Sequence, residues 1–343
     1  MNAAAYHLTP RRGLDGLTSV PQQPPEPGPE QVVIRVSAAS LNRRDLVLMD
    51  GDYPLDPTPG IIPLSDGVGE VIAIGDNVTR AVIGDRVTAT YFITWIDGPL
   101  RMSMAGRQYG VNHNGMLATF AVLEEDSVVH VPVHLTDIEA ATLACAGTTA
   151  WAALNTPVPL SDTDMVLVVG TGSVALFALQ FAHVLGARTI AVTSSSEKAE
   201  RLRKLAVDEV IDRTATPDWE HLVRALTDGD GVTHVVDTVG MPTLAKSIRA
   251  AALNAQITVP GTFPGPPGGL GPEPFGGNFV SIRRIAVGSR TTMEEMVHSI
   301  TEHRLHPVID RVFPFVEAPD AYRYYRTGNP FGKVVVTIGE GHS

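Results

Sequence analysis

The chain has 343 residues, of which 44% are hydrophobic and 18% charged, a composition typical of a globular enzyme with two domains. Its net charge of −11 at pH 7 argues against nucleic acid and anionic membranes as partners. Cys145 is the single cysteine, which excludes an internal disulfide and a multi-cysteine zinc site. The sequence has no apolar stretch of membrane-spanning length and no secretory signal, so we expect a cytoplasmic protein.

The first 130 residues are predicted to form a compact β-rich unit. Short alternating segments at 31–37, 69–74, 86–90 and 119–122 have the pattern of half-buried strands, and Gly, Pro and Asp turns separate them. A proline-rich stretch at 21–29 is typical of a surface connection. The pattern indicates an antiparallel or barrel-like arrangement.

The segment 165–175 (MVLVVGTGSVA) is the most informative part of the chain. An apolar run ends in a Gly-Thr-Gly turn and continues as a helix, which is the G-x-G-x-x-G/A pattern of a dinucleotide-binding turn. The first glycine permits the tight turn, and the second lets the backbone approach a pyrophosphate. N–H groups at the start of the helix are expected to face the phosphates. The predicted contacts are Gly170, Gly172, Ser173 and Val174.

Further strand–helix units surround this turn. Apolar segments at 189–192, 209–211 and 234–236 alternate with helix-patterned segments such as 174–185 and 197–205. This alternation predicts a parallel, doubly wound sheet, whose strands are buried on both faces.

The end of the second strand of this sheet distinguishes NADH from NADPH. Chains that bind NAD place an acidic residue there to hold the ribose 2′-OH, whereas this chain has Ser194 and Ser195, followed by Lys198. Hydroxyls and a lysine at a helix N-terminus suit a 2′-phosphate, which favours NADPH over NADH. The alternative is that these serines only cap the helix.

The C-terminal part contains one unusual loop and a simple succession of elements. A Gly- and Pro-rich stretch at 265–277 is predicted to be a flexible loop near the cofactor, or only a linker. Beyond it we expect a helix at 292–303, a strand at 312–315, a helix at 318–325 and a strand at 333–338.

Five separated motifs resemble, in the correct order, landmarks of the medium-chain dehydrogenase/reductase superfamily. The resemblance covers nearly the whole chain and is strongest to the zinc-free branch that contains quinone oxidoreductases and enoyl reductases. The motifs are 38–45 (AASLNRRD), 63–71 (PLSDGVGEV), 82–87 (VIGDRV), 145–151 (CAGTTAW) and 331–336 (FGKVVV).

The resemblance implies an α/β fold of two domains. A GroES-like β-rich catalytic domain would comprise residues 1–129 and 276–343, and a Rossmann dinucleotide-binding domain would comprise residues 130–275. Relatives usually pair through the Rossmann sheet, so we expect a homodimer with segment 285–288 at the edge.

The resemblance also implies that no metal is bound. Relatives with catalytic zinc have a Cys where this chain has Asn42 and a His-Glu pair where it has Ser65 and Asp66. A catalytic zinc needs about three protein ligands, and here only Cys145 remains, with Asp66 as a weak further donor. In its apolar surroundings Cys145 is predicted to be a buried packing residue.

Without zinc, other groups must stabilise the charge that develops on a substrate oxygen and supply a proton. The predicted catalytic residues are Asn42, which the resemblance places near the nicotinamide, Arg43 and Tyr53. For Arg43 the alternative is an ion pair with Asp45 at the surface or at a domain interface.

An aromatic cluster is predicted to contact the substrate. Tyr91, Phe92 and Trp95 suit a flat, apolar substrate such as a quinone, although they would equally suit a core or a dimer interface. His113, in the following segment, is a candidate proton donor.

The family pattern implies further cofactor contacts. Thr149 is expected to face the nicotinamide, Arg213 to reach the 2′-phosphate, and Lys333 to close the cleft from the C-terminal segment. Other contacts would follow the later strands of the sheet, namely Val239, Thr262 and Phe263.

The sequence therefore predicts an NADPH-dependent, zinc-independent oxidoreductase that delivers hydride to a small-molecule substrate, a quinone or an α,β-unsaturated carbonyl. Two alternatives remain. One is a reductase of a ketone, an imine or a specialised biosynthetic intermediate, and the other is a non-catalytic NADPH-binding protein.

Overall fold

The computed structural model describes residues 3–261, 276–277 and 279–338. The chain forms two compact units: unit 1 comprises Met1–Thr148 and Gly288–Ser343, and unit 2 comprises Thr149–Val287. Both boundaries differ from the expected positions after 129 and 275. Helix α3 (Asp137–Ala140) packs against strands of unit 1, and strand β13 (Ser281–Ile285) pairs within the sheet of unit 2.

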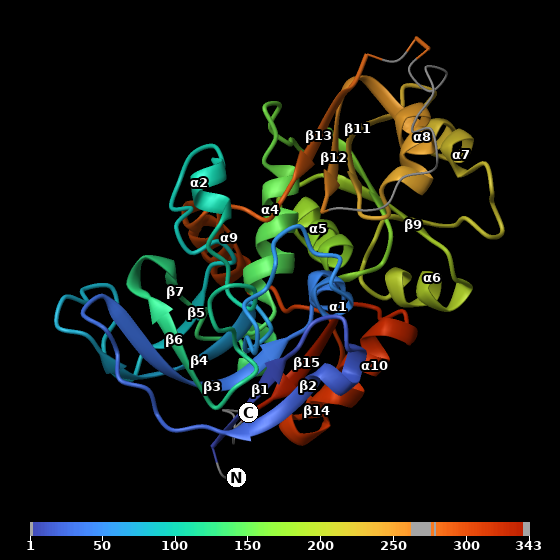
Figure 1. Ribbon diagram of the computed structural model, residues 1–343. Coiled ribbons are helices and arrows are strands. Elements are labelled where there is room, and N and C mark those ends of the chain that lie inside the picture. Colours follow the sequence, from blue (N-terminus) through green and yellow to red (C-terminus); the bar gives the residue numbers. More distant parts are fainter. Residues whose placement is uncertain (1–2, 262–275, 278, 339–343) are drawn as a thin grey trace. The chain divides into compact units, whose positions relative to one another are not determined.

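Unit 1 contains a two-stranded and a seven-stranded sheet (Figure 1). Its described strands are β1 (Ala4–Leu8), β2 (Leu17–Pro21), β3 (Gln31–Ser40), β4 (Asp66–Ile74), β5 (Arg86–Ala89), β6 (Phe120–Glu124), β7 (Val128–His130), β14 (Ile309–Pro314) and β15 (Lys333–Thr337). Its other helices are α1 (Arg43–Asp50), α2 (Met102–Ala105), α9 (Arg290–His303) and α10 (Ala318–Thr327).

The larger sheet of unit 1 joins the two ends of the chain. Its order is β14-β15-β3-β4-β5-β7, and β6 pairs with the other part of β3. The C-terminal strand β15 runs antiparallel to β3, whose alternating side chains Val32, Ile34 and Val36 are buried in the core. This pairing explains why the unit is built from two segments of the sequence.

Unit 2 is a six-stranded parallel sheet in the order β10-β9-β8-β11-β12-β13. The remaining strands are β8 (Met165–Val169), β9 (Arg188–Thr193), β10 (Glu209–Asp212), β11 (Val232–Asp237) and β12 (Ala251–Pro260). The helices are α4 (Thr148–Leu154), which begins at the last residue of unit 1, α5 (Ser173–Val184), α6 (Ser196–Arg203), α7 (Trp219–Leu226) and α8 (Met241–Ala250). The strand order reverses between β8 and β11, and in such sheets ligands bind beyond the carboxyl ends of the strands at this point. The predicted doubly wound parallel sheet is confirmed.

Two features of the fold differ from the sequence pattern. Strand β12 was implied only by the contacts expected after the later strands, and its bounds were not predicted, because polar residues interrupt its apolar run. Within it, Asn254 adopts a left-handed conformation with φ 63°. The predicted edge segment 285–288 begins at the last residue of β13, a strand that contains two arginines and forms the edge of the sheet. No helix in the described part of the chain has the length and apolar character needed to cross a membrane.

Candidate active site

The start of helix α1 places three polar side chains of unit 1. Asn42 is the N-cap, and its backbone N–H donates to Asp45 Oδ2 at 2.7 Å. Arg44 and Asp45 lie on the buried face of the helix with Leu48, whereas Arg43 is exposed. The surface Arg43–Asp45 pair considered from the sequence is therefore replaced by a buried pair between Arg44 and Asp45, 3.9 Å apart. Sequence reasoning missed Arg44, although its i, i+4 spacing to Leu48 was the available signal.

A buried lysine lies beside Asn42. Lys333 is only 1% exposed, and its Nζ donates to Leu41 O at 3.0 Å and to Asn42 Oδ1 at 2.9 Å. The same ammonium forms an ion pair with Asp66 Oδ2 at 3.4 Å. The strand register explains the proximity, because Ser40 of β3 pairs with Val335 of β15 on one side and with Asp66 of β4 on the other.

This lysine determines the orientation of the Asn42 amide. An ammonium group only donates hydrogen bonds, so the carbonyl oxygen of Asn42 must face Lys333 and the amide nitrogen must face away. Asn42 Nδ2 is buried and has no hydrogen-bond partner among the described residues. A buried amide N–H that lacks an acceptor costs about 1–3 kcal/mol, so a bound molecule that supplied an oxygen there would be favoured.

The residues at the expected metal position do not fit a catalytic zinc. Asp66 Oδ1 accepts from Ser65 Oγ at 2.7 Å, and Oδ2 accepts from the backbone N–H of Cys145 at 3.1 Å. Loss of solvation, and then the charge of Asp66, raise the pKa of the Cys145 thiol to about 12, so the thiolate that zinc prefers is disfavoured. The ammonium of Lys333 already supplies the cation that these oxygens face. Among the described residues, no three His, Cys, Asp or Glu side chains form a metal-binding group. Cys145 is partly exposed, not the buried packing residue that its neighbours in sequence predicted.

The group around Asn42, Lys333 and Asp66 is the first part of a polar cluster in unit 1. A hydrogen-bonded chain of two tyrosines and a glutamine forms its second part. Tyr53 OH donates to Gln108 Oε1 at 2.7 Å, and its oxygen is 2.7 Å from Tyr91 OH. Gln108 Nε2 donates to Ala105 O at 2.8 Å, which identifies the other amide atom as the oxygen. A short antiparallel bridge between Phe92 and Gln108 brings the two segments together.

Arg44 lies against both tyrosines. Its guanidinium carbon is 4.4 Å from the ring centre of Tyr91 and 5.5 Å from that of Tyr53, and Nη2 donates to Tyr109 O at 2.9 Å. Burial raises the pKa of Tyr91 well above its usual value, and the charge of Arg44 opposes that rise. Burial also raises the pKa of Asp45 to about 6, against the lowering effect of Arg44. The two parts are joined through Asp45, which pairs with Arg44 at 3.9 Å and accepts from the backbone N–H of Asn42 at 2.7 Å.

The other residues predicted to contact the substrate, Phe92, Trp95 and His113, are largely occupied by contacts within the protein. Phe92 is buried and packs edge-to-face against Tyr91 and against the partly buried Trp95, with ring centres 4.7 and 5.8 Å apart. His113 Nε2 accepts from Arg107, and burial, followed by the charge of Arg107, lowers the pKa of His113. The hydrogen bond from Arg107 thus occupies Nε2 of the imidazole that was expected to donate a proton.

In unit 2 the glycine turn has the geometry expected for a dinucleotide. Gly170 has φ 112°, and a Cβ there would come within 2.4 Å of Thr238 Oγ1, so only glycine fits. Gly172, the N-cap of α5, has an ordinary φ of −75°, and a Cβ there would meet nothing within 4 Å. The space above Gly172 and the free N–H groups at the start of α5 fit a pyrophosphate.

The tip of β9 forms the N-terminal cap of helix α6. Ser195 caps α6 by accepting from the backbone N–H of Lys198 at 3.4 Å, as the capping alternative proposed. Ser194 is exposed, and the side chain of Lys198 is largely buried. The backbone N–H of Arg213 donates to Thr193 O at 2.9 Å, which places Arg213 beside the tip.

The loop after β11 depends on a residue that sequence reasoning missed. Asp237 is completely buried and accepts from the backbone N–H groups of Val239 and Gly240 at 3.1 and 2.8 Å. The hydroxyls of Thr243 and Ser247 also donate to it, at 2.8 and 2.7 Å. Thr149 is buried at the start of unit 2, and the predicted contacts Thr262 and Phe263 lie outside the described residues.

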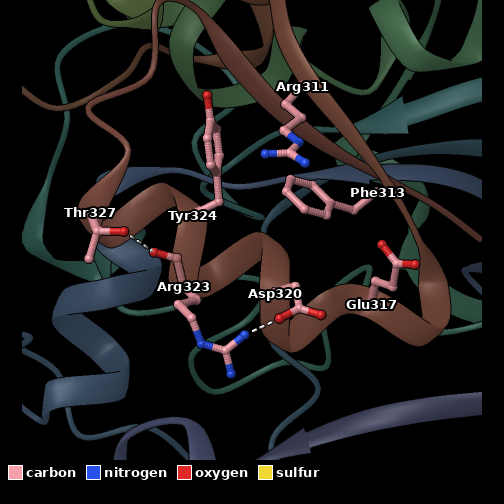
Figure 2. A pocket seen from close by; sticks show the side chains of 7 residues that line it. All are labelled: Arg311, Phe313, Glu317, Asp320, Arg323, Tyr324 and Thr327. Atoms are coloured by element: carbon pink, nitrogen blue, oxygen red, sulfur yellow. Dashed lines mark hydrogen bonds and ion pairs between the residues drawn. The ribbon is translucent and has the colours of Figure 1, made fainter.

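A surface pocket of about 370 Å³ in unit 1 contains none of the predicted site residues. Figure 2 shows Arg323 paired to Asp320 on one side of the pocket and Arg311 beside Phe313 and Tyr324 on the other. The guanidinium of Arg311 lies 4.9 and 5.0 Å from the ring centres of Phe313 and Tyr324. The pocket is lined by Arg311, Phe313, Glu317, Asp320, Arg323, Tyr324 and Thr327. None of these residues belongs to the group around Asn42, Lys333 and Tyr53, so the pocket is a separate feature of unit 1.

Comparison with known proteins finds two family models that match successive parts of the chain. Residues 28–133 match the family model of the alcohol dehydrogenase GroES-like domain, and residues 173–302 match that of the zinc-binding dehydrogenase. A zinc-type alcohol dehydrogenase-like protein of Schizosaccharomyces pombe is 35% identical, over 95% of this chain and 96% of the relative. A quinone oxidoreductase of Pseudomonas aeruginosa is 31% identical, over 87% of this chain and 83% of the relative.

Solved structures share the fold over nearly the full length. A crystal structure from Sinorhizobium meliloti, described as an alcohol dehydrogenase, has 36% identity and a TM-score of 0.88, with 98% of this chain and 100% of that chain covered. The predicted resemblance is confirmed: the chain belongs to the medium-chain dehydrogenase/reductase superfamily and is an NAD(P)H-dependent oxidoreductase.

Proposed function

We propose that this protein is an NADPH-dependent, zinc-independent reductase of quinones or α,β-unsaturated carbonyl compounds. The observation that carries the proposal is the ammonium of Lys333, which bonds to Asn42 and Asp66, the residues that stand where relatives with catalytic zinc have metal ligands. Without a metal to polarise an isolated ketone, a conjugated acceptor is the easier substrate, because it spreads the developing charge. Relatives named quinone oxidoreductase and acryloyl-coenzyme A reductase support this class.

The residues of unit 1 have distinct roles in this reaction. When bound, NADPH supplies a hydride to the conjugated carbon of the substrate. Asn42 Nδ2, which has no hydrogen-bond partner in the described structure, donates to the substrate oxygen that becomes negatively charged. Lys333 holds the amide in this orientation, and Tyr53 supplies the proton that completes the reduction.

Unit 2 binds the dinucleotide through the turn at Gly170 and Gly172 and through the start of α5. We assign the preference for NADPH to the tip of β9, where Ser194 and Lys198 would hold the 2′-phosphate together with Arg213. Lys198→Ala is expected to weaken NADPH binding about tenfold or more and to change NADH binding little, in line with the loss of a charge-assisted phosphate contact. Equal losses for both cofactors would assign Lys198 a structural role instead.

We also propose a homodimer that forms through unit 2. Strand β13 is the edge of the six-stranded sheet, and its backbone N–H and C=O groups on the outer side can pair with a second copy. Light scattering at several concentrations tests this proposal.

The function itself is tested by measuring oxidation of NADPH and NADH with quinones, enones, enals and simple ketones, with and without a chelator. We expect chelator-insensitive, NADPH-linked reduction of the conjugated substrates and loss of turnover in Tyr53→Phe with unchanged NADPH affinity. Turnover restricted to simple ketones, or abolished by the chelator, would contradict the proposal. Tight NADPH binding without turnover on any substrate would favour the non-catalytic alternative.

A further inference from the structure

We propose that Arg44 is a positioning residue that stabilises negative charge on the Tyr53–Tyr91 pair and thereby enables Tyr53 to give up its proton to the substrate. This inference rests on the proposed function and adds to it the device behind the proton donor. It follows from the order of the hydrogen bonds, from the incomplete pairing of Arg44 and from the position of its charge.

The direction of each hydrogen bond in the tyrosine chain can be assigned. The backbone carbonyl of Ala105 accepts from Gln108 Nε2, so Gln108 presents its oxygen to Tyr53. Tyr53 therefore donates its only proton to Gln108, and the hydrogen bond between the two phenols must come from Tyr91. The oxygen of Tyr53 thus already accepts the hydrogen bond that would stabilise it as a tyrosinate.

The buried guanidinium of Arg44 makes fewer hydrogen bonds than its N–H groups could donate. It is 8% exposed, its Nη2 donates to Tyr109 O, and Nε and Nη1 have no hydrogen-bond partner among the described residues. Its nearest carboxylate oxygen, on Asp45, is 3.9 Å away. Arg86 in the same unit shows the contrast, because its Nε donates to Asp137 at 2.9 Å and its Nη2 forms an ion pair with the same oxygen at 2.8 Å.

The charge of Arg44 faces the two phenols. The guanidinium lies over the ring of Tyr91 at 4.4 Å and near the ring of Tyr53 at 5.5 Å. Arg44 and Tyr91 are buried, and Tyr53 is partly exposed. In such surroundings a charge acts more strongly than in water. The arrangement therefore combines an accessible phenol that can meet a substrate with a buried cation behind it.

Tyr53 transfers its proton to the enolate that hydride addition leaves. Hydride addition to the β-carbon of an enone moves the electron pair of the C=C bond toward the carbonyl and leaves an enolate. The O–H bond of Tyr53 breaks, its proton forms the new C–H bond at the α-carbon, and the tyrosinate keeps the electron pair. Tyr91 O–H and Arg44 stabilise this tyrosinate until water returns a proton. With a quinone the same proton passes to the hydroquinone oxygen.

The test compares Arg44→Met, Arg44→Lys and Tyr91→Phe with Arg86→Met, which removes a paired arginine of the same unit as a matched control. For Arg44→Met and Tyr91→Phe we expect kcat for an enone to fall by about 10- to 100-fold, with NADPH affinity unchanged, because a general acid contributes at least this much. The solvent isotope effect on kcat should rise, since proton transfer becomes limiting. Arg44→Lys, which keeps the charge, should recover part of the rate, and Arg86→Met should lower thermal stability without lowering kcat.

The inference would be overturned if kcat of Arg44→Met lay within about twofold of that of Arg86→Met, or if its solvent isotope effect were that of the wild type. If Arg44→Met does not fold, Arg44→Lys and Tyr91→Phe decide by the same criteria. Absence of turnover in the wild type would contradict the proposed function and leave the phenol pair to be tested by ultraviolet titration. Tyrosinate absorbance should then appear at higher pH in Arg44→Met than in Arg86→Met, and identical curves would overturn the inference.

Discussion

Removal of the Lys333 ammonium by substitution with methionine tests the central contact of the site. Methionine retains most of the apolar stem but none of the donors, so Leu41 O and Asn42 Oδ1 lose hydrogen bonds of 3.0 and 2.9 Å. Asp66 loses its ion-pair partner at 3.4 Å while it remains completely buried. We expect a stable wild type and a strongly destabilised variant.

The magnitude follows from the buried charge. Removal of one partner of a buried ion pair costs about 3–5 kcal/mol, because the other charge is left uncompensated. For a domain of the size of unit 1, each kcal/mol corresponds to about 2–4 °C in Tm, so Lys333→Met should lower Tm by about 6–20 °C. Asp66→Asn alone should have a cost of the same order, since it leaves the ammonium uncompensated. The double variant removes both charges, so its loss should be about 3 kcal/mol or more below the sum of the single losses.

Thermal and urea unfolding of the wild type, the two single variants and the double variant measure this coupling. The assignment would fail if the losses added to within about 0.5 kcal/mol, which is the behaviour of independent sites. It would also fail if Lys333→Met cost less than about 1 kcal/mol, the value of an exposed ion pair. A functional readout comes from the double variant: its Asn42 amide is no longer oriented, so kcat should fall even where the fold is retained.

Further predictions concern the cofactor turn, the buried carboxylate of α1 and the loop after β11. Gly172→Ala should leave stability unchanged but weaken NADPH binding, because the new Cβ enters only the space proposed for the pyrophosphate. Gly170→Ala should also destabilise the fold by about 1–3 kcal/mol, since its φ is 112° and the added Cβ would come within 2.4 Å of Thr238 Oγ1. Calorimetric titration and thermal unfolding separate the two effects, and an unaltered NADPH affinity in Gly172→Ala would refute the proposed phosphate position. Burial raises the pKa of Asp45 from 3.8 to about 6. The contribution of Asp45 to the free energy of unfolding is therefore complete below pH 3.8 and is lost as the pH rises through about 6. In urea unfolding at several pH values, Asp45→Asn should remove this part of the pH dependence. Asp237→Ala should destabilise unit 2 by about 3 kcal/mol or more, because four buried donors lose their acceptor, and a loss below about 1 kcal/mol would contradict that account.

The sequence by itself was sufficient for the fold class and for the dinucleotide turn. Both depend on local patterns: a run such as Met165–Val169 followed by two glycines has few structural solutions, and the apolar periods of α5 and β9 lie within one element each. The two domain boundaries were displaced because they depend on which sheet accepts β13 and on what α3 packs against. Those choices are made between elements distant in sequence.

Only the tertiary structure decided which polar residues form the site. Asn42 and Tyr53 were predicted from the resemblance. Arg44 lies in the site in place of Arg43 because successive helix residues point about 100° apart, and the local pattern did not show which of the two faces the core. Lys333 and Asp66 are 267 residues apart in sequence and meet because β15 and β4 both pair with β3. Gln108 accepts a hydrogen bond from Tyr53, and a backbone bridge to Phe92 that no periodicity predicts places its segment there. Hydrophobic periodicity selects elements, whereas long-range strand register and the need to satisfy buried charges select the partners of each polar side chain.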